Sequence, residues 1–307
     1  MPNSTVSSEN LTELEQIELI EKIVLSEKLT LLKPFGDQLY YVQSLGKAID
    51  QLKREGITVE DLVTATNKQK LDFDLIEDLY HEKGAYKGEM KGKYQELQRE
   101  IAKNEELAIV YQRYQQGLID QKRYDFNDML LEVLQILRKN KSLLLRLQEK
   151  YQYVLVDEHQ DTNNAQNRIV ELLCSFYENP NLFVVGDEKQ AIFRFQGATL
   201  ENFIYFKQLY PQAVLINLTD NYRSNQTVLD AAASVISQNA TTNVLFPDGN
   251  ELKAQSGINN HQIQVAELSD FYSEFYFVAD QIEKLIKEDV VGGEIAVIGR
   301  NNKDLQT

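Results

Sequence analysis

The stretch Val154-Leu155-Val156-Asp157-Glu158-His159-Gln160-Asp161-Thr162 decides the fold of this chain. Its three apolar residues predict a short strand, and two adjacent carboxylates follow where that strand ends. In α/β proteins, ligands bind at the carboxyl edge of the sheet. One of the two acids can hold Mg²⁺ through its water shell while its neighbour orients or deprotonates an attacking water. Taken alone, the same pair could also be a turn former or a helix cap.

A second apolar run, residues 182–185, ends in Gly186-Asp187-Glu188-Lys189-Gln190. A neutral glutamine amide such as that of Gln190 can bond a terminal phosphate without titrating. Phe193 and Phe195 follow in the same loop and could stack on bases. Without further context, a turn followed by core aromatics explains the same residues.

A third apolar run, residues 214–218, ends in Thr219-Asp220-Asn221-Tyr222-Arg223-Ser224, where Ser224 would cap the next helix. Arg223 could reach a γ-phosphate and Tyr222 could stack on an adenine. An ordinary exposed Tyr-Arg pair remains the alternative.

From residue 151, short apolar runs alternate with helical patterns, which predicts a parallel sheet with crossover helices. The expected strands are 153–156, 182–185, 214–218, 262–268 and 294–298, and the expected helices are 164–177, 199–209, 225–237 and 273–287.

Residues 11–150 are predicted to be helical throughout. Asn10, with Glu13 three residues later, is the expected cap of the first helix, and Gly56 ends a later one. The lysine- and glycine-rich segment 81–93 is either an exposed loop between two helices or a contact to duplex DNA through Lys83, Lys87, Lys91 and Lys93.

The 307 residues suffice for about two domains, and 43% hydrophobic with 26% charged residues is typical of a globular protein. Neither a membrane span nor a signal peptide is evident, so a cytoplasmic protein is expected. The single cysteine, Cys174, is expected in the core. The net charge of −15 argues against a broad basic surface, but a strand-binding groove needs only a local lining of donors and stacking surfaces.

Three stretches in this order, VLVDEHQDTNNAQ (154–166), VVGDEKQAIFRFQGA (184–198) and LTDNYRS (218–224), closely resemble motifs II, III and IV of the UvrD/Rep/PcrA helicases of superfamily 1. The segments YDFNDMLL (124–131) and EIAVIGRNN (294–302) resemble flanking segments of the same family. His159 departs from the pattern, because phenylalanine is common there, and Gln196 replaces an arginine expected near DNA.

The resemblance implies an α/β fold with incomplete RecA-like (P-loop NTPase) parallel sheets and an N-terminal all-helical insertion subdomain. It divides the chain into a helical 1B-like subdomain (1–151), the later part of a first RecA-like subdomain (152–217) and the start of a second (218–307).

The resemblance also implies roles for single residues. Asp157 would hold Mg²⁺, and Glu158 would activate the hydrolytic water. Gln190 would sense the γ-phosphate and Arg223 would neutralise transition-state charge. The nucleotide would contact Tyr222 and Gln160, and DNA would contact Thr162, Phe193, Arg194 and Phe195.

The implied function is part of an ATP- and Mg²⁺-dependent DNA helicase or translocase, moving 3′ to 5′ in DNA repair or replication. Its partners would be single-stranded DNA, single-strand/duplex junctions, and repair or replication proteins, with no membrane. The chain holds no Gly-x-x-x-x-Gly-Lys-[Ser/Thr] phosphate loop. We therefore expect an internal fragment that does not turn over ATP alone. The alternatives are a motor-dead module that binds single-stranded nucleic acid or a partner, and a nucleotide-independent α/β scaffold.

Overall fold

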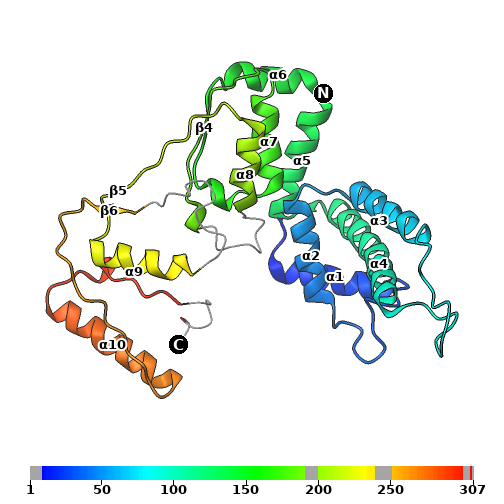
Figure 1. Cartoon of the computed structure of the whole chain (residues 1–307), viewed down its shortest axis with the longest axis horizontal. Coiled ribbons are helices and arrows are strands. Elements are labelled where there is room, and N and C mark those ends of the chain that lie inside the picture. The colour runs from blue at the N-terminus through cyan, green and yellow to red at the C-terminus, as the bar shows by residue number, and fades with distance from the viewer. Residues whose placement is uncertain (1–8, 191–199, 239–250, 300–304, 306–307) are drawn as a thin grey trace. The chain divides into compact units, whose positions relative to one another are not determined.

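A computed structural model describes residues 9–190, 200–238, 251–299 and 305 (Figure 1). The described residues up to 217 form one compact unit, and those from 218 onward form a second. The first unit contains the helices α1 (Glu13–Ser26), α2 (Val42–Arg54), α3 (Val59–Asp74), α4 (Gly92–Gln121), α5 (Phe126–Lys139), α6 (Lys141–Lys150), α7 (Asn164–Cys174) and α8 (Leu200–Leu209). Its strands are β1 (Glu9–Asn10), β2 (Arg123–Tyr124), β3 (Val154–Val156) and β4 (Leu182–Val184).

The main hydrophobic core lies among α1, α2 and α4, with a contribution from α3. Ile20, Ile49, Val110 and Tyr114 are completely buried there. Each helix buries one apolar stripe, as the spacing of apolar residues predicts. The cap of α1 is Thr12 rather than Asn10: its hydroxyl accepts from the Glu15 amide, and the Glu15 carboxylate accepts from the Thr12 amide. The Asn10 prediction was wrong because Asn10 pairs in β1 with Tyr124 of β2.

The helices α3 and α4 lie side by side as a long antiparallel pair (Figure 1). Their connection carries two isolated bridges, Tyr80 to Met90 and His81 to Lys87. Gly84 and Gly88 adopt positive φ in its turns, where glycine avoids the Cβ clash. The connection is exposed, as one of the two sequence interpretations requires. Contact between its lysines and a duplex stays a prediction.

A buried ion cluster joins the helical core to the start of α5. Lys53 of α2 is fully buried and pairs with Asp125 and with Asp128, the latter at 2.6 Å. The Tyr114 hydroxyl of α4 donates to Asp125 at 3.0 Å. Asp125 is also the N-cap of α5, in a capping box with Asp128. Because α5 packs against α7, this cluster connects the helical core to the helix that follows the acid pair.

The strands β3 and β4 are parallel neighbours, with Val154 opposite Leu182 and Val156 opposite Val184. Together with the helices around them, they confirm the predicted α/β class with parallel strands and an N-terminal helical region. Cys174 is buried, as predicted. The predicted boundaries of the three subdomains stay predictions.

The second unit contains β5 (Asp220–Asn221), α9 (Gln226–Ser237), β6 (Lys253–Ala254) and α10 (Phe271–Lys287). The strands β5 and β6 pair in parallel. Asn225, not Ser224, caps α9 by accepting from the Val228 amide at 3.1 Å. Across the described residues, no helix combines the length and apolar character that crossing a membrane requires.

Three strand predictions were wrong. Residues 214–218, 262–268 and 294–298 form no strand in the described part of the chain. A strand needs a hydrogen-bonded neighbour, and these segments have apolar residues without one. Val265 and Ile298, for example, are each 92% exposed.

Candidate functional site

Parallel pairing brings the ends of β3 and β4 to one edge of the first unit. Beyond the strands, the Val185 amide donates to Val156 O at 2.8 Å, and the His159 amide donates to Val185 O at 3.0 Å. The pairing therefore extends to the point where Asp157 and Glu158 leave β3 and Gly186 and Asp187 leave β4. The first two residues are at least 28 positions from the last two in the sequence, and the two pairs meet only through the sheet.

Both acids of the predicted pair are exposed at this edge. Asp157 Oδ1 accepts a hydrogen bond from the Glu158 amide at 3.0 Å. Glu158 adopts the left-handed conformation, with φ 48° and ψ 44°, directly before the 3₁₀ turn His159–Asp161. A residue with a Cβ is strained in this conformation, and such strain persists only where the surroundings impose it. Here the bonds at Val185 and the 3₁₀ turn fix the backbone on both sides.

Gln160 lies beneath the acid pair and is 1% exposed. Its Nε2 donates to Glu158 Oε2 at 2.5 Å, and its Oε1 accepts from the Asp187 amide at 3.0 Å. Both polar ends of the Gln160 side chain therefore bond within the protein. A contact between Gln160 and a nucleotide stays a prediction.

Gln190 belongs to the 3₁₀ turn Glu188–Gln190 beyond β4. Its Nε2 donates to Asp187 Oδ2 at 2.9 Å, and Asp187 Oδ1 accepts from the Lys189 amide at 2.9 Å. Gln190 is exposed, so its amide is accessible to a ligand. The sequence predicted Gln190 but not the carboxylate of Asp187 that orients it; a Gly-Asp pair at the end of the strand was the available signal.

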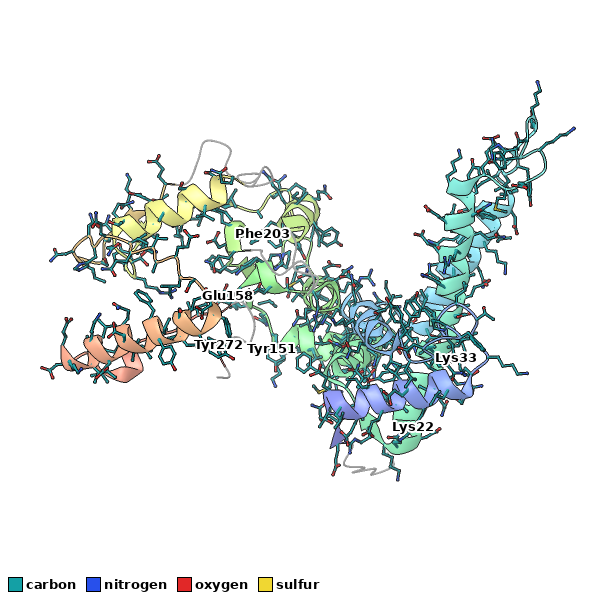
Figure 2. The ribbon with its side chains drawn as sticks, turned by 90° about the horizontal axis from the view of Figure 1, so that it is seen from below. Lys22, Lys33, Tyr151, Glu158, Phe203 and Tyr272 are labelled. Carbon is teal, nitrogen blue, oxygen red and sulfur yellow. The ribbon has the colours of Figure 1, made fainter. Side chains whose placement is uncertain are left out.

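His159 and Thr162 pack into the protein behind the acids. The buried His159 ring meets Phe203 of α8 edge to face, with ring centres 5.2 Å apart. Figure 2 labels Phe203 on this helix. An aromatic ring at this position thus packs against α8, which explains how His159 can occupy a position where phenylalanine is common. Thr162 Oγ1 donates to His159 O at 2.7 Å and lies 3.0 Å from Asn167 Oδ1. Contact between Thr162 and DNA stays a prediction.

Arg223 and Tyr222 belong to the second unit, where they follow β5. Asn221 Oδ1 accepts from the amides of Arg223 and Ser224, at 3.0 and 2.8 Å. This turn leaves both Arg223 and Tyr222 exposed. Phe193, Arg194 and Phe195, the predicted contacts to DNA, lie outside the described residues.

Among the described residues, no three His, Cys, Asp or Glu side chains gather as a complete protein cage for a metal ion. The chemistry of Mg²⁺ does not require one, since this ion usually keeps several waters and binds one or two carboxylates together with substrate phosphates. The exposed carboxylate of Asp157 fits that requirement.

Comparison with known proteins agrees with this geometry. Residues 6–211 match a family described as the UvrD/REP helicase N-terminal domain, and residues 216–307 match the UvrD-like helicase C-terminal domain. A "Probable DNA helicase II homolog" of Rickettsia felis is 35% identical over 195 residues, which are 62% of this chain and 28% of that protein. An "ATP-dependent DNA helicase PcrA" of Staphylococcus aureus is 35% identical over 196 residues, which are 64% of this chain and 26% of that protein.

The matched region thus spans little more than a quarter of the length of these curated relatives. The two family matches together cover nearly all of this chain, from residue 6 to residue 307. They confirm the predicted resemblance and the partial RecA-like fold. The chain belongs to the UvrD/REP family of helicases.

Proposed function

We propose that this chain is part of an ATP-dependent DNA helicase or translocase that moves 3′ to 5′ along single-stranded DNA and acts in repair or replication. The observation that carries the proposal is the arrangement at the edge of β3 and β4. There an exposed acid pair, Asp157 and Glu158, and an oriented amide, Gln190, follow neighbouring parallel strands in a chain of the UvrD/REP family.

In the proposed reaction, Asp157 binds the water shell of Mg²⁺, which neutralises charge on the ATP phosphates when bound. Glu158 accepts a proton from the attacking water, and the Gln190 amide bonds the γ-phosphate. Arg223 stabilises the charge that develops on the transferred group, and Tyr222 stacks on the adenine.

The proposed DNA contacts are Phe193, Phe195, Arg194 and Thr162, at a single-stranded segment or a junction with a duplex. Stacking on aromatic rings tolerates any base, as a translocating motor requires. In a bacterial cell, like those of the named relatives, such a motor would work in the cytoplasm together with repair or replication proteins.

The direct test uses the gene product that contains this chain. We expect ATP hydrolysis that DNA stimulates, and Mg²⁺-dependent unwinding of a duplex with a 3′ single-stranded tail but not of one with a 5′ tail. Glu149→Gln, at an exposed position of α6, is a control that should retain both activities. A wild-type protein that binds DNA but hydrolyses no ATP contradicts the proposal.

One observation favours a second candidate, a module without motor activity that binds single-stranded nucleic acid or a partner protein. The 307 residues contain no phosphate loop, so they lack the backbone amides and the lysine that hold ATP phosphates. The retained acids and Arg223 argue against this candidate, because a pure binding module has no use for them. A reading frame that contains no glycine-rich phosphate loop upstream of Met1 would support it.

A further inference from the structure

Gln160 is the most deeply buried polar side chain at the edge of β3 and β4, among the residues that the structure describes there. Its two polar atoms bond in different directions. Nε2 reaches Glu158, two residues back, and Oε1 reaches the backbone amide of Asp187, 27 residues further along the chain. A single amide therefore joins the two strand ends below their exposed surface.

Gly186 makes room for this arrangement. A Cβ at position 186 would lie 2.5 Å from Gln160 Oε1 and 2.8 Å from the ring of Phe203, closer than such atoms can approach. The glycine thus lets the backbone after β4 come close enough to Gln160 for the Asp187 amide to donate. Both contacts of the hypothetical Cβ are to partly or fully buried side chains, which have little space to move away.

The connection continues past Asp187 to Gln190. The Asp187 carboxylate accepts from the Gln190 side-chain amide at 2.9 Å, and Asp187 O accepts from the Gln190 backbone amide at 3.1 Å. A continuous path of hydrogen bonds therefore runs from the Glu158 carboxylate through Gln160 and Asp187 to the side-chain amide of Gln190.

We infer that Gln160 is a positioning residue, which fixes the carboxylate of Glu158 and the amide of Gln190 relative to each other. The inference rests on the proposed function, in which Glu158 activates water and Gln190 bonds the γ-phosphate. Without the Nε2 donor, the exposed Glu158 side chain would be free to occupy several rotamers. Without the Oε1 acceptor, the turn that carries Gln190 would lose the bond at Asp187 and keep the backbone bond between His159 and Val185 O.

Two substitutions separate these two bonds. Gln160→Leu removes both of them. Gln160→Glu keeps an oxygen to accept from the Asp187 amide but loses the donor to Glu158 and places a second carboxylate beside it. Gln148→Leu is a matched control, because Gln148 is also buried and its Nε2 donates to Leu172 O at 2.7 Å and to Ser175 Oγ at 3.2 Å, not to the acids.

The kinetic readout is DNA-stimulated ATP hydrolysis by the gene product that contains this chain. For both Gln160 variants we expect kcat to fall about 10- to 100-fold, as for small misplacements of catalytic groups. The KM for ATP should change by less than roughly threefold, since a positioning residue acts on the transition state rather than on ground-state binding. Gln148→Leu should keep the wild-type kcat.

The structural readout is exchange of the Asp187 amide hydrogen in the 307-residue chain, measured by NMR. In Gln160→Leu it should exchange at least about fivefold faster than in wild type, the effect of losing one net hydrogen bond. In Gln160→Glu its rate should stay near wild type. Unchanged exchange in Gln160→Leu would overturn the inference.

The two hypotheses fail differently. One outcome rejects the positioning role alone: wild type hydrolyses ATP, Glu158→Gln does not, and Gln160→Leu has the same kcat as Gln148→Leu. In that case the proposed function stands. If wild type shows no hydrolysis at all, the proposed function falls, and the catalytic role of Gln160 falls with it.

Discussion

The helical region, residues 13–150, and the strand-bearing regions that follow differ in how they bury apolar residues. In the helical region, α1, α2 and α4 enclose a core in which Ile20, Ile49 and Val110 are completely buried. In the second unit, Leu229 is the only buried hydrophobic side chain among the described residues, and α10 has none.

The difference follows from the range of the interactions. An amphipathic helix finds partners in the next helices along the chain, whereas a parallel strand pairs with a strand that returns only after a crossover. Local signals therefore suffice to specify the helices of this region, although its core also joins residues far apart in the sequence. In the strand-bearing regions, conformation depends on contacts between distant residues, and at Glu158 those contacts even impose a strained backbone.

The largest expected effect comes from breaking the buried ion cluster of the helical region. Lys53→Met leaves the carboxylates of Asp125 and Asp128 without their cation, which should lower the free energy of unfolding by about 3–5 kcal/mol. Urea unfolding followed by circular dichroism measures this. The control is Lys70→Met, since solvent screens the partly exposed Lys70–Glu105 pair and its loss should change stability little. Equal effects of the two substitutions would contradict the account.

The next effect concerns Glu106 of α4, whose carboxylate accepts from the amides of Thr30, Leu31 and Leu32 at 2.7 to 3.1 Å. Burial by itself raises the pKa of Glu106, but these hydrogen bonds outweigh it and lower the pKa below the ordinary 4.5. Glu106→Gln should cost about 1.5–3 kcal/mol at neutral pH, as for hydrogen bonds to a charged group.

The pH dependence of that cost follows from the sign of the shift. A carboxylate with a lowered pKa stabilises the fold above its ordinary pKa, and this contribution disappears as the pH falls through the lowered value. The difference between wild type and Glu106→Gln should therefore shrink in acid. Glu105→Gln, at the half-exposed neighbouring residue, should show little difference at any pH.

A third prediction concerns the strained backbone at the end of β3. Because Glu158 has positive φ, Glu158→Gly should be more stable than Glu158→Ala by about 1–2 kcal/mol. At Glu100, an exposed position inside α4, the order should reverse by roughly 0.5–1 kcal/mol. Thermal unfolding of the four variants gives both differences, and the same order at both positions would show that residue 158 is not left-handed.

The smallest expected effect is the change in stability caused by the same substitution, Ile→Val, in each of the two regions. Ile49→Val removes a methyl group from the core and should cost about 0.5–1.5 kcal/mol. Ile298 is 92% exposed, so Ile298→Val should change stability by less than about 0.5 kcal/mol. A cost at Ile298 equal to that at Ile49 would mean that the segment is packed against a partner.

The same contrast explains which features could be predicted from the sequence. Most helices were predicted, because apolar spacing acts within a few positions. The prediction that residues 11–150 are helical throughout was wrong at 27–41 and 75–91, which form no α-helix. The strands β3 and β4 were also predicted, since their pairing keeps both runs extended. The runs at 214–218, 262–268 and 294–298 have the same apolar character but no neighbour in the described chain, and apolar character alone does not make a strand.

At the candidate site, the place of the acids and of Gln190 at one sheet edge could be predicted, because the acids follow β3 directly and Gln190 lies in the turn after β4. The bond from Gln160 to Asp187 could not, because it joins residues 27 positions apart through a register that only the sheet sets. The left-handed backbone conformation of Glu158 could not be predicted either, since glutamate has no local preference for it.

The most direct test of the central claim is the kcat for DNA-stimulated ATP hydrolysis by the gene product carrying Glu158→Gln. This substitution preserves size but replaces the carboxylate with a neutral amide, which cannot accept a proton from water. We expect kcat to fall at least about 100-fold, as for loss of a general base, while ATP still binds. A kcat equal to that of wild type and of Glu149→Gln would contradict the assignment of Glu158 and the reading of this sheet edge as the hydrolytic site.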